Sequence, residues 1–443
     1  MTPRHLTLLA VAALALAWPW LPEFTITLLC YIGLYAMVAA GLVMLTGVGG
    51  MTSFGQAAFV GIGAYATAWA STSPALAAAI GGTISPTWGP WLGLALGMLL
   101  AAGVAWILGA VTLKLSGHYL PLATIAWGLG IYFLFGNLDF LGGHTGTGGV
   151  PPIVVGDVSL ADSRVMGVVI WAALLLMLWA LHNLLDSREG RAIRALKGRR
   201  LMAESMGVDT AAYRVKVFVL AALMAALSGW FYAHLQRFVN PTPFNLNIGI
   251  EYLFMAVVGG AGHLWGAVLG AALITLLKSQ LQDVLPKLLG SSGNFEVIVF
   301  GLLMLVVLHR FADGMWPTLA RVSRRFLRPA PASVRATGAS LPPRPLPPKG
   351  QVLLESTAAS KHFGGLKAVD EVTLDVRAGE VHALIGPNGA GKSTYFNMVS
   401  GVIDLTAGAV RVMGQDMTNR PSRQFAALGL GRTFQHVRLM AQR

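Results

Sequence analysis

The sequence predicts a polytopic α-helical membrane domain of about eight to ten spans or half-spans, followed by a shorter α/β segment. Its 443 residues are 55% hydrophobic and 12% charged, with a mean hydropathy of +0.64. This is more apolar surface than a soluble core requires. The apolar runs stop near residue 310, and a proline-rich stretch separates them from a C-terminal part of ordinary composition. The natural solvent of the first part is therefore a bilayer.

The membrane helices are predicted from apolar runs, because a helix needs about 20 mostly apolar residues to cross the hydrocarbon core. Such runs lie near 6–22, 25–46, 54–71, 91–113, 119–138, 165–184, 215–235, 250–260, 265–281 and 295–309. The first follows Arg4 and resembles a signal peptide, but the many spans behind it favour an uncleaved anchor.

Two basic tracts predict the orientation of these spans. Lys and Arg outnumber Asp and Glu by eight to four over 186–216 and by eight to one over 310–349. Both tracts should be cytoplasmic, which requires an even number of crossings between them. Four crossings result if the run over 251–281 folds back at Gly259-Gly260-Ala261-Gly262-His263, on the cytoplasmic side.

Glycine is abundant, with 53 residues, and two clusters of it are informative. Gly262, Gly266 and Gly270 have the spacing that lets helix backbones touch in lipid. A second cluster over 47–63 surrounds Ser53 and Gln56. This cluster indicates an interrupted helix whose free backbone groups face protein or a water-filled cavity. The alternative is that the glycines serve only the close packing of helices. Ser53 and Gln56 are the candidates for a substrate pathway.

The charged residues and the single cysteine exclude several classes of protein. The net charge of +13 concentrates beside apolar segments, so we expect no nucleic-acid partner. Asp139, Glu251 and Glu296 lie near predicted span ends, and nothing resembles the proton relay of an ion-coupled carrier. Cys30 is the sole cysteine, lies in an apolar run and excludes an intrachain disulfide.

The basic loop between two predicted spans alternates apolar and basic residues at helical spacing over 190–207. Such a helix either lies on anionic membrane lipid or docks in a groove of a partner protein. The length of the loop, about 30 residues, favours docking.

A phosphate-binding loop is predicted in the C-terminal part. Strand-like runs at 351–355, 372–376 and 381–385 precede a G-x-x-x-x-G-K-[S/T] motif, and a helix is expected over 392–400. The glycines permit a turn whose N–H groups face phosphates, and the helix N-terminus adds positive charge. Lys392 should contact the β- and γ-phosphates of ATP, and Ser393 should hold Mg²⁺. The alternative is a glycine turn that binds no phosphate, but such a turn gives no reason for Lys392 and Ser393 to follow it. The predicted nucleotide-binding residues are Gly386, Pro387, Asn388, Gly389, Ala390, Gly391, Lys392, Ser393 and Thr394.

The C-terminal part resembles the ATPase subunit of ATP-binding-cassette (ABC) importers of branched-chain amino acids. The similarity lies in Phe363-Gly-Gly-Leu-Lys-Ala-Val-Asp370, in the phosphate loop with the strand before it, and in Gly431-Arg-Thr-Phe-Gln435. The resemblance implies that Phe363 stacks on adenine. It also implies that Gln435 is the Q-loop glutamine, which senses Mg²⁺ and the γ-phosphate.

The membrane part resembles the second permease subunit of the same family. The matching stretches are 41–65, 142–152, 190–207 and 256–267. The resemblance implies that the loop over 190–207 docks on the ATPase, with Arg191, Arg194, Glu204 and Gly207 as its coupling residues.

The resemblance implies ATP-driven import of branched-chain or other small hydrophobic amino acids across the bacterial inner membrane, with the ATP-binding part in the cytoplasm. The expected partners are a second permease subunit, a second ATP-binding subunit and a periplasmic substrate-binding protein. An importer of urea, amides or another small solute is one alternative, and an inactive membrane scaffold is another.

The resemblance also divides the chain into parts. We expect a transmembrane permease domain over 1–312, a basic, Pro-rich cytoplasmic linker over 313–350, and over 351–443 the N-terminal part of an ABC ATP-binding domain, truncated after the Q-loop. The signature motif, the Walker B aspartate and the switch histidine do not occur in these residues. We therefore expect this chain alone to bind ATP without hydrolysing it.

Overall fold

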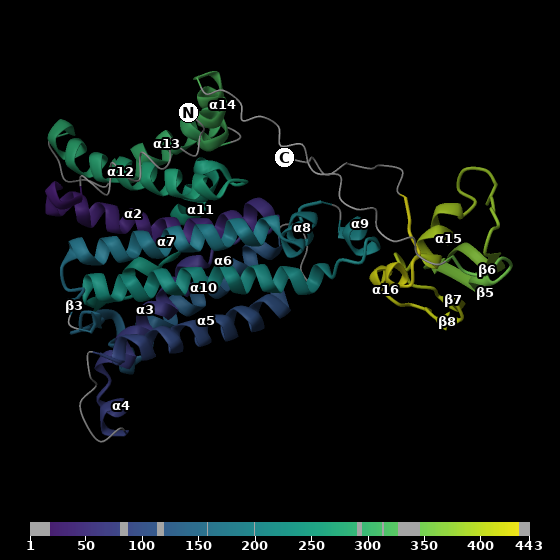
Figure 1. Cartoon of the computed structure of the whole chain (residues 1–443), viewed down its shortest axis with the longest axis horizontal. Helices are drawn as coiled ribbons and strands as arrows, with labels where there is room; N and C mark the ends of the chain where they lie inside the picture. The colour runs from purple at the N-terminus through teal and green to yellow at the C-terminus, as the bar shows by residue number, and fades with distance from the viewer. Residues whose placement is uncertain are drawn as a thin grey trace. The chain divides into compact units, whose positions relative to one another are not determined.

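The computed structural model describes residues 18–79, 87–112, 119–156, 158–198, 200–289, 295–311, 314–326 and 346–433 (Figure 1). They form two compact units. The first draws on 1–194 and 211–330, and the second on 195–210 and 331–443. The loop predicted to dock on the ATPase is thus shared between the two units.

The first unit is a bundle of long apolar helices. Six of them, within the described residues, are long and apolar enough to cross a membrane: Glu23–Val48, Gly89–Thr112, Tyr119–Asn137, Ser163–Asp186, Thr210–Gln236 and Leu264–Val284. They comprise α2 (Glu23–Leu42) with the π-helical η2 (Val43–Val48), α5 (Gly89–Thr112), α6 (Tyr119–Asn137), α7 (Ser163–Asp186), α10 (Thr210–Gln236) and most of α12 (Leu264–Leu289). The predicted polytopic membrane fold is confirmed. The predicted span over 6–22 lies outside the described residues, apart from its end at η1 (Trp18–Trp20).

Shorter helices complete the bundle. They are α3 (Gln56–Thr72), α4 (Pro74–Ala79), α11 (Leu246–Gly260) and α13 (Phe295–Arg310). Between α6 and α7 lie η3 (Asp139–Leu141), η4 (Gly143–Thr145) and the two-residue strands β1 (Thr147–Gly148), β2 (Val154–Val155) and β3 (Val158–Ser159). Strand β1 pairs with β4 (Phe238–Val239), which follows α10 and precedes η5 (Thr242–Phe244). The β1–β4 pairing ties two connections that are far apart in the sequence.

The helix interruption predicted around Gly47–Gly63 is present. The α-helix ends at Leu42, a π-helix runs to Val48, and α3 begins only at Gln56. A Cβ atom at Gly47 would lie 1.2 Å from the carbonyl oxygen of Ala261. Glycine is therefore required there, because no side chain fits between the two backbones.

Helices α11 and α12 form the predicted hairpin, with its turn at Ala261–His263. A Cβ at Gly266 would lie 2.6 Å from the carbonyl oxygen of Gly259, and one at Gly270 would lie 1.8 Å from that of Met255. These two glycines bring the helix backbones together as predicted. The same role for Gly262 is wrong, since it lies in the turn and a Cβ there would meet no atom within 4 Å.

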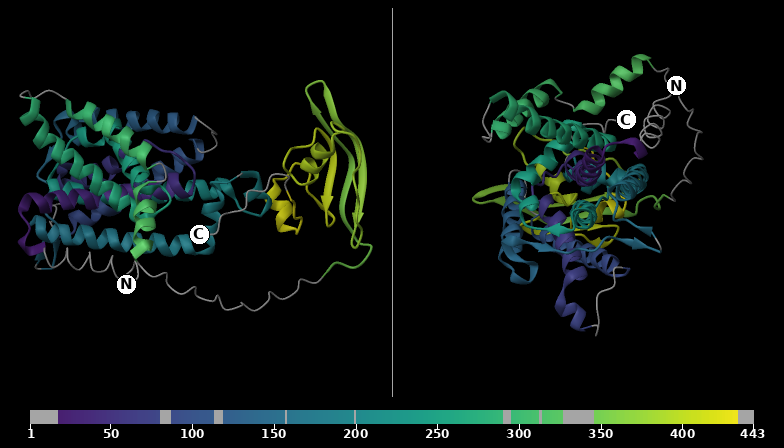
Figure 2. Two further views of the ribbon diagram at one scale, coloured as in Figure 1. Left: turned by 90° about the horizontal axis from the view of Figure 1, so that it is seen from above. Right: turned by 90° about the vertical axis from the view of Figure 1, so that its left-hand side faces the viewer.

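Helix α14 (Met315–Phe326) follows α13 at a bend of 49°. The left view of Figure 2 shows it running across the long helices of the bundle. Its start is held close, because a Cβ at Gly314 would lie 2.3 Å from the Cα of Gly260. Helix α14 occupies part of the stretch predicted as linker, and the proline-rich residues 327–345 lie outside the described ones.

The second unit contains a four-stranded antiparallel sheet in the order β6-β5-β7-β8. Its elements are β5 (Val352–Phe363), β6 (Leu366–Arg377), α15 (Lys392–Val399), β7 (Ala407–Val412), β8 (Gln415–Asp416) and α16 (Ser422–Ala427), with α9 (Arg200–Ser205) from the loop. A separate core fills it, formed by residues that include Ala359, Tyr395, Met398, Val410 and Phe425.

The strand predicted over 381–385 is wrong. These residues have no regular structure, and Val381 and Ile385 are 97% and 89% exposed. A buried apolar strand needs pairing partners. In the described residues the two edges of β5 are taken by β6 and β7, and no strand pairs with 381–385.

Candidate functional site

The phosphate loop joins residue 385 to α15 and depends on glycine. Gly386, Gly389 and Gly391 have φ angles of +156°, +86° and +79°. Side chains strongly disfavour positive φ, so glycine at these positions permits the turn. Gly391 also lies against β6, where a Cβ would be 2.1 Å from the carbonyl oxygen of Ala368. Pro387, Asn388 and Ala390 lie between the glycines, in an exposed stretch.

Lys392 opens α15 and folds back over this loop. Its Nζ donates to the carbonyl oxygens of Gly386 and Pro387 at 2.6 Å each. Ser393 and Thr394 follow in the first turn of the helix. An exposed glycine turn, a helix N-terminus and an ammonium group held at the turn together fit a phosphate chain. The side chain of Ser393 is exposed.

Phe363 lies at the end of β5, next to the hairpin that leads into β6. Its ring is 52% exposed, and the Nζ of Lys361 lies 5.4 Å from the ring centroid. Gly391 abuts β6, which pairs with β5, so the phosphate loop touches the sheet that carries Phe363.

Gln435 lies outside the described residues, but the chain leading to it is held by Arg432. The guanidinium of Arg432 donates to the carbonyl oxygen of Phe396, to Oγ of Ser400 and to Oδ1 of Asn397, the last two at 2.6 Å. Burial lowers the pKa of this guanidinium. Sequence reasoning did not assign Arg432 a role, although it lies in the Gly431–Gln435 motif. These contacts form because the fold brings the chain back beside α15, and local sequence does not reveal that return.

The two residues predicted for a substrate pathway are buried in the first unit. Ser53 and Gln56 are each 1% exposed. The Oγ of Ser53 and both amide atoms of Gln56 have no hydrogen-bond partner among the described residues. Buried polar atoms of this kind are costly and are rare without a functional reason.

The basic loop forms two separate helices, α8 (Arg188–Ala195) and α9. The sequence had indicated one helix with a continuous apolar face. Arg191 and Arg194 lie in α8 of the first unit. Nη2 of Arg194 lies 3.8 Å from Oδ1 of Asp186. Glu204 and Gly207 belong to the second unit. Oε1 of Glu204 accepts a hydrogen bond from Thr210 at 2.6 Å, and Gly207, in the turn that follows α9, has a φ of +84°.

Helix α9 packs against α16 within the second unit. Asp209, just after α9, lies 2.6 Å from Nη1 of Arg423 in α16. The C-terminal part of the loop is therefore held by the same unit that carries the phosphate loop. Sequence reasoning missed both Asp209 and Arg423, because their pairing depends on tertiary packing.

Two known protein families match two separate stretches of the chain. Residues 24–308 match the family described as the permease component of the branched-chain amino acid transport system. The chain belongs to this permease family. Residues 369–443 match the ABC transporter family. The protein is thus a multi-pass ABC transporter permease of the branched-chain amino acid type with an ATPase-like part.

Individual relatives show the same two-part similarity. The chain is 25% identical to the high-affinity branched-chain amino acid transport permease LivM of Escherichia coli (strain K12) over 339 residues, covering 71% of the chain and 75% of LivM. It is 44% identical to the ATP-binding protein LivG of Salmonella typhimurium (strain LT2) over 92 residues. That match covers 21% of the chain and 36% of LivG. The chain therefore spans about a third of the length of this ATP-binding relative.

Proposed function

We propose that the protein imports branched-chain or other small hydrophobic amino acids across the bacterial inner membrane, driven by ATP. The observation that supports this most is the glycine turn at 386–391, closed by Lys392 and followed by α15, in one chain with six apolar helices. The names of the relatives LivM and LivG support the substrate class.

The nucleotide-binding roles follow from the geometry of the phosphate loop. Lys392 would exchange its two carbonyl contacts for the β- and γ-phosphate oxygens of ATP. The exposed N–H groups of the loop would bind the same phosphates, Ser393 and Gln435 would hold Mg²⁺, and Phe363 would stack on the adenine. Bound ATP would shift the transporter between two conformations through its differential affinity for them, and hydrolysis by the complete transporter would supply the free energy for each cycle.

Coupling would run through the basic loop. Since α9 packs on α16 and Asp209 pairs with Arg423, movement of the ATP-binding part would be transmitted to α10, which begins directly after Asp209. Arg191 and Arg194 would complete this coupling loop on the membrane side, and Glu204 and Gly207 would shape it.

We further propose the partners and the location of the protein. A second permease subunit and a second ATP-binding subunit would complete the transporter, and a periplasmic substrate-binding protein would deliver the amino acid. The basic tracts favour a cytoplasmic ATP-binding part.

The test is uptake of radiolabelled leucine by cells that carry the chain with its partner subunits. Lys392→Ala should abolish ATP-dependent uptake while leaving membrane insertion intact. Lys367→Ala is the matched control, because Lys367 lies in the same unit and pairs with Asp370 on the surface. Uptake by Lys392→Ala at the parental rate would overturn the proposal.

A further inference from the structure

The C-terminal end of α15 is joined to two other segments of the second unit. Helix α15 runs from Lys392 at the phosphate loop to Val399, which makes it about 12 Å long. The last carbonyl oxygens of a helix have no partner inside it. Two of those at this end, on Phe396 and on the C-cap residue Ser400, accept hydrogen bonds from residues far away in the sequence.

Arg432 is one of these distant donors, and it bridges three groups. Its Nη1 donates to the carbonyl oxygen of Phe396 at 3.1 Å and to Oγ of Ser400 at 2.6 Å, and its Nη2 donates to Oδ1 of Asn397 at 2.6 Å. A guanidinium suits this role, because its N–H groups point in fixed directions. Its positive charge also complements the negative end of the helix dipole. Arg432 therefore ties the last turn of α15 to the segment that leads to Gln435.

Ser400 is the residue at which this helix end meets α16. Its side chain is buried, and its carbonyl oxygen accepts a hydrogen bond from Oγ of Ser422, the first residue of α16, which is buried too. Gly401 lies against the ring of Phe425 in α16, where a Cβ would be 2.5 Å from a ring carbon. A buried hydrogen bond and close packing thus join α15 to α16.

Helix α16 continues this series of contacts to the coupling loop. Arg423 follows Ser422 and lies 2.6 Å from Asp209, and α16 packs against α9 just before Asp209. These residues all belong to the second unit. Direct contacts therefore lead from the phosphate loop along α15, through Ser400 and Ser422, to the loop between α8 and α10.

We propose that the junction of Ser400, Ser422 and Arg432 transmits nucleotide binding from α15 to the coupling loop. Phosphates bound at the N-terminus of α15 displace this short helix as one body, so the displacement reaches Ser400. Ser422 passes it to α16, and Arg432 keeps the last turn of α15 aligned. Arg432 and Ser422 are positioning residues, since neither contacts the phosphate loop among the described residues. This inference rests on the proposed function, and it names the residues that couple its two ends.

A spin label beside α9 measures the transmission separately from binding. In a Cys30→Ser background, Met206→Cys places the label just after α9, where the native side chain is 63% exposed. In the whole chain in detergent, MgATP should change the mobility of this label. Arg432→Gln should remove that change and leave the Kd for MgATP, measured by titration calorimetry, at the parental value. The reason is that Arg432 contacts the end of α15 remote from the phosphate loop.

Ser422→Ala is a second variant that cuts only the link to α16. It removes one hydroxyl and leaves every group of Arg432 in place, so the second unit should keep its fold. We expect this variant also to lose the response of the label and to keep the Kd for MgATP. Arg411→Gln is the matched control, because it removes an exposed arginine from β7 of the same unit. Its label response and its Kd should match the parent.

Transport kinetics test the junction in the complete transporter. Arg432→Gln should lower the maximal rate of leucine uptake about tenfold, since a hydrogen bond to a charged group is worth at least that factor. The KM for leucine should stay unchanged, because the membrane part is not altered. A merely structural role of Arg432 would instead weaken MgATP binding and lower the thermal midpoint of the second unit.

The outcomes separate the junction from the function. If the parental chain binds no MgATP, or the parental transporter takes up no leucine, the proposed function fails. If both activities are present, but MgATP leaves the parental label unchanged or both variants keep the parental response and uptake rate, the function stands and the junction is overturned. Loss of MgATP binding in Arg432→Gln would also overturn it, because Arg432 would then support the phosphate loop itself.

Discussion

At the scale of single residues, the positions predicted best are those whose role is set by the local backbone. Gly386, Gly389 and Gly391 follow from the motif alone, because a turn of this shape requires positive φ wherever it occurs. Arg432 and Asp209 were missed for the opposite reason. Their partners, in α15 and α16, lie far away in sequence, and only the tertiary fold brings them together.

Glycine at position 47 provides the sharpest prediction at this scale. Gly47→Ala should destabilise the bundle strongly, because the new Cβ would lie 1.2 Å from a backbone oxygen that cannot move aside. Overpacking usually costs about 1–3 kcal/mol, and a clash with backbone belongs at the upper end. The measurement is the thermal midpoint of the protein in detergent.

The control for Gly47 comes from the same contact region. Gly262→Ala adds a Cβ that meets no atom within 4 Å, so its thermal midpoint should match the parent. Equal stability of the two variants would contradict the close approach of η2 to the α11–α12 turn.

At the scale of helices and strands, the membrane helices were predictable because length and apolarity alone define them. The helix interruption before α3 was predictable from its glycines. The strand expected over 381–385 was not, since an apolar run becomes a strand only where neighbouring strands pair with it. In the basic loop, periodicity indicated helix but not the break between α8 and α9.

The contact between α9 and α16 predicts a charge-swap phenotype. Asp209→Arg and Arg423→Asp should each reduce coupled transport, because like charges would then face each other across a contact now 2.6 Å long. The double variant should recover much of the loss. Both side chains are about 40% exposed, so the pair itself contributes only about 0.2–1 kcal/mol.

The measurement for this pair is leucine uptake in a double-mutant cycle. Additive losses without recovery in the double variant would contradict a direct pairing of the two side chains in the working transporter.

Helix α14 predicts an interfacial position. Leu319 and Val322 lie three residues apart, both 48% exposed, with Arg321 exposed between them. Because α14 follows the apolar α13 directly, the apolar pair should insert between lipid headgroups while the basic residues face anionic lipid.

Spin labels test this position of α14 in the full chain, reconstituted in vesicles with anionic lipid. In a Cys30→Ser background, labels at Leu319→Cys and Val322→Cys should be more accessible to oxygen than to a water-soluble nickel complex. A label at Arg321→Cys should show the reverse. Equal water accessibility at all three positions would refute the interfacial placement.

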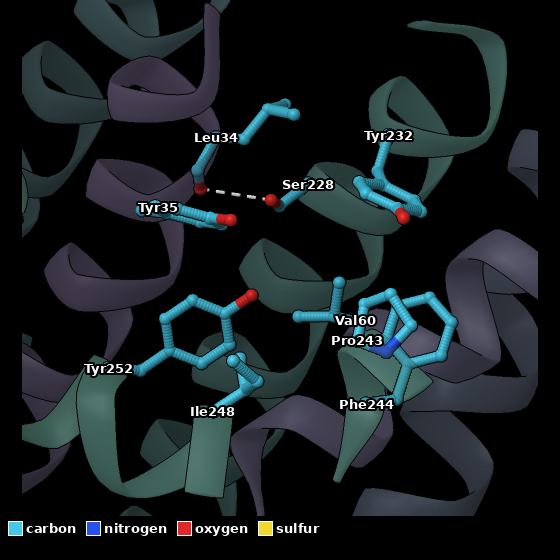
Figure 3. Close-up of a pocket in the computed structure, with 9 residues that line it drawn as sticks. All are labelled: Leu34, Tyr35, Val60, Ser228, Tyr232, Pro243, Phe244, Ile248 and Tyr252. Atoms are coloured by element: carbon cyan, nitrogen blue, oxygen red, sulfur yellow. Dashed lines mark hydrogen bonds between the residues drawn. The ribbon is translucent and has the colours of Figure 1, made fainter. Parts of the chain in front are cut away.

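At the scale of the whole molecule, the two compact units have separate interiors. The first is a helix bundle that buries glycine and small residues at its contacts, whereas the second has its own core around Tyr395 and Phe425. Composition indicates a membrane part and a soluble part, because the two obey different rules for apolar surface. The small cavity lined by Tyr35, Tyr232 and Tyr252 (Figure 3) was not predictable, since its lining residues come from five separate elements.

Separate interiors predict separate unfolding transitions, with MgATP acting on one of them. A ligand stabilises only the unit that binds it, by about 2.7 kcal/mol at a concentration of 100 Kd. Calorimetry of the whole chain in detergent should therefore show two transitions, and MgATP should raise the midpoint of the second unit alone. Lys392→Ala should remove this shift and leave both midpoints without nucleotide unchanged, because Lys392 contacts only exposed carbonyl oxygens of the loop. A shift that survives in Lys392→Ala would place the nucleotide elsewhere, and a shift of both midpoints would show that the two units unfold together.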